Sequence, residues 1–309
     1  MPAYREASPD QAAFMDELVE AGVVVPAIVP GVYGRSATFE RVRRGFDALV
    51  ERAAEADAPE RLAFPPVLPR RHIESTGYLG SFPHLAGSVF AFEGPEGEAR
   101  GMAEVAARHE DWSAQLERTE LVLTPAACYP IYPAIAARGP LAPGGVTIDP
   151  GAAFCFRHEP SGDPARLQSF QMHELVRIGE PEVVQAWRDD WRDRAVALLR
   201  GVGLDADFDV AADPFFGRAG RLMAASQRQQ ELKFEVLVPI TEPEATAVAS
   251  FNYHETHFSG AHGIVLKDGT TAHTACLGFG LERITLALLR THGLDLAAWP
   301  GDVREQLGL

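Results

Sequence analysis

The chain has 309 residues, of which 46% are hydrophobic and 23% are charged, and its formal net charge is -15. This composition is typical of a globular protein with a sizeable core and excludes a largely disordered chain. No stretch approaches the roughly 18 uncharged apolar residues of a membrane helix, and the N-terminus has no signal-peptide core. We therefore expect a soluble, cytoplasmic protein with no membrane partner.

Net charge and cysteine content narrow the possible partners. Nucleic-acid binding relies on Lys and Arg to neutralise phosphates, so the acidic balance argues against tRNA or DNA unless a local basic surface exists. The three cysteines, Cys128, Cys155 and Cys276, contain no CxxC pair and cannot form a disulfide framework. Free or metal-bound thiols are expected.

The first 60 residues are predicted to be helical. Apolar residues repeat at helical spacing from Phe39 to Val50, which gives this helix one buried stripe. A strand is expected over 61–66, where Pro65 and Pro66 end it. The pattern predicts an N-terminal helical extension over 1–60, packed on a core domain over 61–309.

Short strands and turns dominate from residue 120 onward. Two alternating strands joined by the polar loop 160–166 predict an antiparallel hairpin, and a helix over 181–201 begins with proline and ends at glycine. The expected class is α+β, an antiparallel sheet flanked by helices. The expected strands span 121–127, 145–151, 152–159, 167–179, 233–239, 247–252 and 270–277, and the further expected helices span 218–230 and 280–290.

A carboxylate on an apolar strand face is the first candidate site. Alternation from Phe170 to Ile178 places Glu174 among apolar residues, where it needs a cation or a metal. An arginine ion pair is the simpler explanation from this strand alone. Cys128 follows one predicted strand and Cys276 ends another, and two thiolates with one carboxylate suit zinc with a position left for substrate. Two buried, unliganded thiols are the alternative, and Cys155 is a rival ligand.

The hairpin and the last helix carry candidate anion-binding groups. Arg157 and Glu159 share a face of the hairpin's first strand, Arg166 lies in its loop, and Phe170 offers a stacking surface. A surface salt bridge is the ordinary explanation of such a pair. Arg283 lies in the first turn of a helix preceded by two glycines, which favours phosphate binding. No Walker loop exists, and the 254–257 stretch HETH lacks the HExxH spacing and is interpreted as a polar loop.

Together these segments resemble the three signature motifs of class II aminoacyl-tRNA synthetases, particularly the seryl type. The stretch 156–159 with Arg166 and Phe170 resembles motif 2, in which arginines contact ATP phosphates and the aromatic ring stacks on adenine. The stretch 278–283 (GFGLER) closely resembles motif 3, and 46–66 resembles motif 1, the dimer-forming helix and strand. The resemblance implies a class II synthetase-like catalytic domain over 61–309 and a homodimer.

More narrowly, the stretches 128–130 (CYP), 157–160 (RHEP) and 274–276 (TAC), with Glu174, are similar to the amino acid:[carrier protein] ligases, truncated relatives of archaeal-type seryl-tRNA synthetases. The resemblance implies Zn²⁺ bound by Cys128, Glu174 and Cys276, and catalytic roles for Arg157 and Arg283. It implies an ATP site, with Mg²⁺ near Glu235, formed by Arg157, Glu159, Arg166, Leu167, Phe170, Lys233, Glu235, Ala247, Val248, Ala249, Ser250 and Arg283.

The implied reaction is ATP-dependent activation of a small amino acid, glycine or alanine in preference to serine, and transfer to the phosphopantetheine thiol of a carrier protein. An acidic carrier needs a local basic patch on this acidic chain. Arg218, Arg221 and Arg228 are spaced to share one helix face and are expected to supply it, with tRNA binding not expected. A small seryl-type tRNA synthetase and a non-catalytic, partner-binding paralogue are the alternatives.

Overall fold

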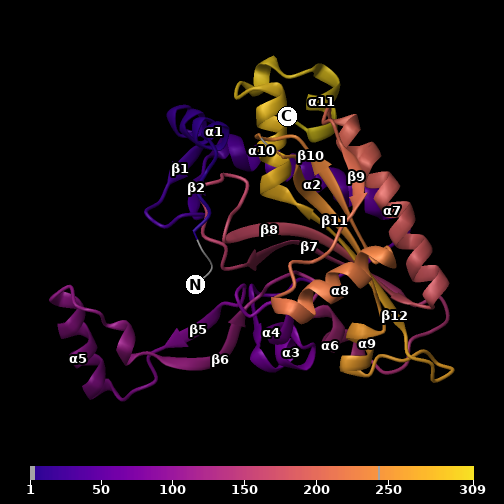
Figure 1. Ribbon diagram of the computed structural model, residues 1–309, viewed down its shortest axis with the longest axis horizontal. Helices are drawn as coiled ribbons and strands as arrows, with labels where there is room; N and C mark the ends of the chain where they lie inside the picture. Colours follow the sequence, from indigo (N-terminus) through magenta and orange to yellow (C-terminus); the bar gives the residue numbers. More distant parts are fainter. Residues whose placement is uncertain (1–3, 243) are drawn as a thin grey trace.

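A seven-stranded sheet forms the centre of the molecule in the computed structural model, which describes residues 4–242 and 244–309 (Figure 1). Its strand order is β3-β7-β8-β12-β11-β10-β9, and every neighbouring pair is antiparallel except β3 with β7. The expected antiparallel sheet is therefore confirmed apart from one edge pair. The strands are β3 (Glu60–Arg61), β7 (Val146–Phe156), β8 (Ser169–Gly179), β9 (Asp207–Val210), β10 (Lys233–Val238), β11 (Thr246–Glu255) and β12 (His273–Gly280).

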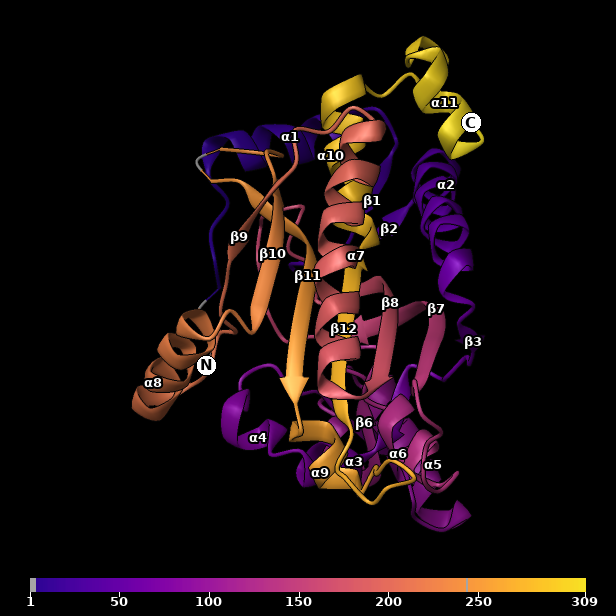
Figure 2. The same cartoon turned by 90° about the vertical axis from the view of Figure 1, so that its right-hand side faces the viewer.

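Five helices pack around this sheet. Ser8 caps α1 with a capping box, Ser36 caps α2, and α7 begins with proline, so local sequence sets each start. Figure 2 shows α7 running lengthwise along the sheet. The helices are α1 (Pro9–Glu20), α2 (Ala37–Ala54), α7 (Pro181–Gly201), α10 (Leu281–His292) and α11 (Gly301–Leu307).

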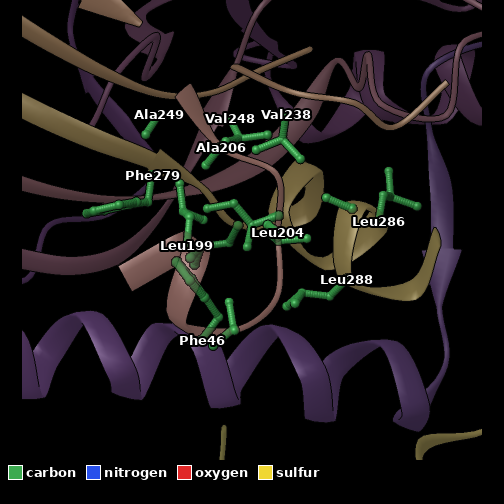
Figure 3. Close-up of a cluster of buried hydrophobic side chains, with 14 of the residues drawn as sticks. Phe46, Leu199, Leu204, Ala206, Val238, Val248, Ala249, Phe279, Leu286 and Leu288 are labelled. Carbon is green, nitrogen blue, oxygen red and sulfur yellow. The ribbon is translucent and has the colours of Figure 1, made fainter. Parts of the chain in front are cut away.

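The main core joins the two ends of the chain. Phe46 of α2 meets Phe279 of β12 edge to face, with ring centroids 5.8 Å apart, and both side chains are fully buried together with Leu199 of α7 and Leu288 of α10 (Figure 3). Burying one such aromatic or leucine side chain stabilises the fold by roughly 1.5–3 kcal/mol. The predicted extension over 1–60, whose first three residues lie outside the described part, thus shares its core with the sheet, and a domain boundary at residue 60 stays a proposal.

The strand expected over 61–66 is largely absent. β3 stops at Arg61, and only the Leu62 N–H continues the pairing, to the Asp149 carbonyl oxygen. Pro65 and Pro66 have no N–H to donate, which explains why no ladder extends through them. Motif 1 therefore keeps its helix and a very short strand.

The stretch from 67 to 123, for which the sequence predicted little, forms a second sheet of order β4-β6-β5. The β5–β6 pair carries α5 away from the body of the molecule (Figure 1), and none of the residues of α5 is buried. The elements of this part are β4 (Val67–Pro69), α3 (Arg70–Ser75), α4 (Tyr78–Ser81), β5 (Ser88–Ala91), α5 (Glu96–Ala107) and β6 (Glu117–Leu123).

Three short helices and a hairpin complete the fold. The predicted helix near 218–230 is α8 (Gly217–Gln229), which stands apart from the sheet in Figure 2. Within the described residues, no helix combines the length and apolarity needed to cross a membrane. The remaining elements are β1 (Val24–Pro26), β2 (Tyr33–Arg35), α6 (Ile131–Ala136) and α9 (His257–His262), with 3-10 turns at Glu55–Asp57, Ser113–Gln115 and Leu296–Ala298.

Candidate active site

One cavity of about 150 Å³ collects nearly all the residues that the sequence singled out. It opens between the β7–β8 hairpin, β10, β11, β12 and the start of α10. Arg166 is the exception, since it lies beside the cavity and donates from Nη1 to Glu159 Oε1 at 2.8 Å. The expected residues that line the cavity are Cys128, Arg157, Glu159, Leu167, Phe170, Glu174, Lys233, Glu235, Ala247, Val248, Ala249, Ser250, Cys276 and Arg283.

Arginines dominate one end of this cavity. Arg283 donates from Nε to the Ala165 carbonyl oxygen and from Nη1 to that of Ala247, each at 2.8 Å, so backbone contacts fix its guanidinium. Burial lowers the pKa of Arg283, and the positive charge of nearby Arg166 lowers it further. Guanidinium groups that repel one another in and beside a cavity favour a polyanionic ligand such as a polyphosphate.

Arg157 was expected on the first hairpin strand, but β7 ends at Phe156 and Arg157 follows it. Its N–H donates to the Gln168 carbonyl oxygen at 2.9 Å, which holds the chain close to the second strand without continuing the ladder. The guanidinium lies over the Phe170 ring, 5.5 Å from its centroid, and Nε donates to the Pro125 carbonyl oxygen at 3.1 Å. The motif 2 residues therefore converge although the strand is shorter than expected.

The second end of the cavity holds the expected metal group. One ligand atom each from Cys128, Glu174 and Cys276 lies within 4.8 Å of the other two, and all three residues are buried. The register between β8 and β12 brings Glu174 close to Cys276. Cys276 faces Val176, which is two residues from Glu174 along β8, and Glu174 faces Gly278. The N–H groups of Ala127 and Cys128 donate to the two Glu174 oxygens at 2.8 Å each, which ties the β6–α6 loop to them.

The chemistry of this group fits a divalent cation. Burial raises the pKa of Glu174 to about 7, and the neighbouring Cys276 thiol adds to the shift. Cys276 is the more acidic thiol, because hydrogen bonds from Cys128, His254 and Asn252 lower its pKa, whereas donation to Cys276 and burial raise the pKa of Cys128. Two thiols and a carboxylate enclosed together match the donor set that zinc prefers.

The rival ligand Cys155 does not join this group. Its thiol is buried in β7, and burial raises its pKa well above the ordinary value. Among the described residues, Cys155 belongs to no cluster of three or more potential metal ligands. Cys155 is instead a small apolar core side chain.

Sequence reasoning missed His254 and Asn252. The HETH stretch is not a polar loop throughout, since β11 continues to Glu255 and α9 begins at His257. Asn252 Nδ2 lies 3.7 Å and His254 Nε2 lies 3.4 Å from Cys276 Sγ. Period-two alternation from Ser250 through Asn252 to His254 would have placed both side chains on one strand face, whereas the β11–β12 register, in which Asn252 faces Cys276, brings that face to the thiol.

The ion pairs of the buried Lys233 add to the site one residue that the sequence did not predict, Asp213. Lys233 Nζ lies 2.6 Å from Asp213 Oδ1 and 3.0 Å from Glu235 Oε1, and all three side chains line the cavity. Lys233 is only 7% exposed. A second cavity of about 480 Å³ adjoins the first, shares Cys128, Asp213 and Cys276 with it, and extends to α4, α8 and α9.

Comparison with known proteins now identifies the family. The chain is 48% identical over 280 residues to amino acid–[acyl-carrier-protein] ligase 1 of Bradyrhizobium diazoefficiens. The aligned residues cover 90% of this chain and 85% of the relative. Ligase 2 of the same organism is 48% identical over 281 residues, 91% of this chain and 84% of the relative. The chain belongs to the amino acid–[acyl-carrier-protein] ligase family. The expected family and enzyme class are confirmed, and no protein-family model matches the chain.

More distant likenesses confirm the class II synthetase fold. A type-2 serine–tRNA ligase of Methanopyrus kandleri is 31% identical over 153 residues, 46% of this chain and 28% of that protein. Seryl-tRNA synthetase from M. kandleri, solved with A. aeolicus tRNASec, superposes with a TM-score of 0.79 at 22% identity over 99% of this chain and 61% of that one. Seryl-tRNA synthetase from Pyrococcus horikoshii, solved with ATP, superposes with a TM-score of 0.70 at 14% identity over 96% of this chain and 62% of that one.

Proposed function

We propose that this ligase uses ATP to activate glycine or alanine as the aminoacyl adenylate and transfers the aminoacyl group to the phosphopantetheine thiol of a carrier protein. The observation that carries the proposal is the single cavity that joins buried arginines to the Cys128, Glu174 and Cys276 group. A polyphosphate and an amino acid can be held there side by side. The names of the 48% identical relatives support the carrier as acceptor.

The arginines act by position and charge. Arg157 orients the amino-acid carboxylate, one oxygen of which attacks the α-phosphorus of ATP while pyrophosphate leaves. Arg283 and Arg166 hold the outer phosphates, and Phe170 stacks on adenine. Preorganised donors of this kind stabilise developing negative charge without reorganising. Glu235 is available for Mg²⁺.

Cys128, Glu174 and Cys276 would hold zinc, which, when bound, supplies a Lewis-acid contact for the substrate's amino group. The two backbone N–H donors keep Glu174 oriented toward the thiols. In the second half-reaction the carrier thiol attacks the adenylate's carbonyl carbon, the thiol proton is lost, and AMP leaves. The adjoining larger cavity offers the thiol a route to the same cysteines.

Helix α8 is the proposed carrier-docking surface. Between 215 and 230 the chain has three arginines and no acidic residue, although the whole chain carries a charge of -15. Arg218, Arg221 and Arg228 are exposed, and Leu222 beside them is 72% exposed. A mixed apolar and basic helix face suits an acidic carrier.

We further propose that the protein is a cytoplasmic homodimer and that it does not use tRNA.

Amino-acid-dependent exchange of pyrophosphate into ATP, tested over all twenty amino acids, separates the candidate functions. Exchange with glycine or alanine, followed by loading of holo carrier protein and not of tRNA, is the expected result. Transfer to tRNA alone would identify a small synthetase. No exchange with any amino acid would leave a non-catalytic, partner-binding paralogue.

A further inference from the structure

Helix α8 is linked by one side chain, Gln227, to the cavity of about 150 Å³ that is proposed to bind ATP, called the nucleotide cavity below. Gly220 is the helix's only buried residue among those described, yet Gln227 makes two hydrogen bonds to Asp213. Gln227 Nε2 donates to Asp213 Oδ2 at 2.9 Å, and the Asp213 N–H donates to Gln227 Oε1 at 2.7 Å. This reciprocal pair fixes both the backbone and the carboxylate of Asp213.

Asp213 in turn contacts Lys233, a residue that lines the nucleotide cavity. Its second oxygen, Oδ1, accepts from Lys233 Nζ at 2.6 Å, and the same ammonium lies 3.0 Å from Glu235 Oε1. Asp213 lines both cavities. Gln227 lines only the larger cavity, and Lys233 lines only the nucleotide cavity. Two consecutive contacts, Gln227 to Asp213 and Asp213 to Lys233, therefore lead from the exposed helix to a buried cation.

We infer that Gln227 is a positioning residue for adenylation, which acts through Asp213 to hold the Lys233 ammonium in the nucleotide cavity. The inference rests on the proposed function, in which this cavity takes ATP and α8 takes the carrier. Without the Gln227 amide, Asp213 keeps its ion pair but loses the contacts that fix its rotamer and backbone. Lys233 then samples positions that bind phosphate less well.

The experiment compares Gln227→Leu with Gln229→Leu in the full-length enzyme. Gln229 is an exposed residue of the same helix, so the control alters α8 without touching Asp213. We expect Gln227→Leu to raise KM for ATP in pyrophosphate exchange about five- to tenfold, with KM for the amino acid nearly unchanged. Gln229→Leu should leave both constants at the wild-type value.

A double-mutant cycle with Asp213→Asn distinguishes positioning from a general loss of folding. If Gln227 acts through Asp213, the double variant resembles Asp213→Asn alone, so the effects on KM for ATP do not add. Additive effects, or an unchanged KM for ATP in Gln227→Leu, would overturn the inference while wild-type exchange still upholds the proposed function. Absence of exchange and of ATP binding in the wild-type enzyme would overturn both.

Discussion

His254 Nε2 lies 3.4 Å from Cys276 Sγ, and the other ring nitrogen, Nδ1, lies 3.1 Å from Thr274 Oγ1. The threonine fixes the ring's orientation while the second nitrogen faces the thiol. Groups that hydrogen-bond to metal ligands orient them and tune their basicity. His254 is thus placed to support the proposed zinc site without being one of its three ligands.

Replacing this histidine should loosen metal binding. We expect His254→Ala to weaken zinc affinity by about tenfold or more, because Cys276 loses an oriented donor. Competition with a chromophoric chelator measures the affinity directly and does not depend on activity. His257→Ala is the matched control, since His257 lines the larger cavity but, among the described residues, makes no side-chain hydrogen bond to either thiol. Equal affinities for both variants would contradict the role.

The three ligands and the third cysteine give a second comparison. Cys276→Ser and Glu174→Gln should each lose most of the bound zinc, because three protein ligands leave no redundancy. Cys155→Ser should retain a full complement, since Cys155 lies outside the group. Elemental analysis of the purified proteins gives the metal content, and pyrophosphate exchange gives the activity. Full zinc content together with full activity in Cys276→Ser would refute the metal assignment.

How far the sequence predicts this site depends on the residue. Alternation along β8 placed Glu174 on the apolar face, and the structure confirms it as 1% exposed. Its convergence with Cys128 depends on the β6–α6 loop, whose path no local pattern encodes. The HETH stretch predicts a loop and therefore conceals His254, and α5 gives only a weak helical signal because no residue in it is buried and Met102 and Val105 are only half-buried.

Arg283 provides a test of the nucleotide end. Arg283→Ala should lower kcat for exchange on the order of a hundredfold, because a preorganised cation at the phosphates is lost. Arg283→Lys should recover little, since one ammonium cannot reproduce both backbone contacts and the planar fork. Arg290→Ala is the control in the same helix, where Arg290 pairs at the surface with Asp10. Near-normal exchange in Arg283→Ala would exclude Arg283 from the chemistry.

Charge reversal on α8 should separate the two half-reactions. The triple variant Arg218→Glu, Arg221→Glu and Arg228→Glu is expected to raise KM for an acidic carrier at least tenfold, because like charges now meet at the docking surface. Pyrophosphate exchange should persist, and the salt dependence of transfer should diminish. Arg108→Glu, at the residue that follows α5, is the control. A carrier KM unaffected by the triple change would place docking elsewhere.

A substitution at Gly45 tests how tightly α2 packs against α11. A Cβ at this position would clash with the backbone oxygen of Leu307, which cannot rotate away, so α11 itself would have to move. Helix propensity alone favours Ala over Gly by about 1 kcal/mol, whereas overpacking a close contact costs about 1–3 kcal/mol. We expect the contact to dominate and Gly45→Ala to lower the thermal unfolding midpoint.

Gly101 of α5 isolates the propensity effect in that comparison. A Cβ there meets no atom within 4 Å, so Gly101→Ala should keep or raise the unfolding midpoint. Differential scanning calorimetry on the two variants and the wild type gives both shifts under one set of conditions. A rise for both variants would mean that α11 moves away from α2 at little cost. A fall for Gly45→Ala alone would establish that the C-terminal helix is packed rigidly against the motif 1 helix.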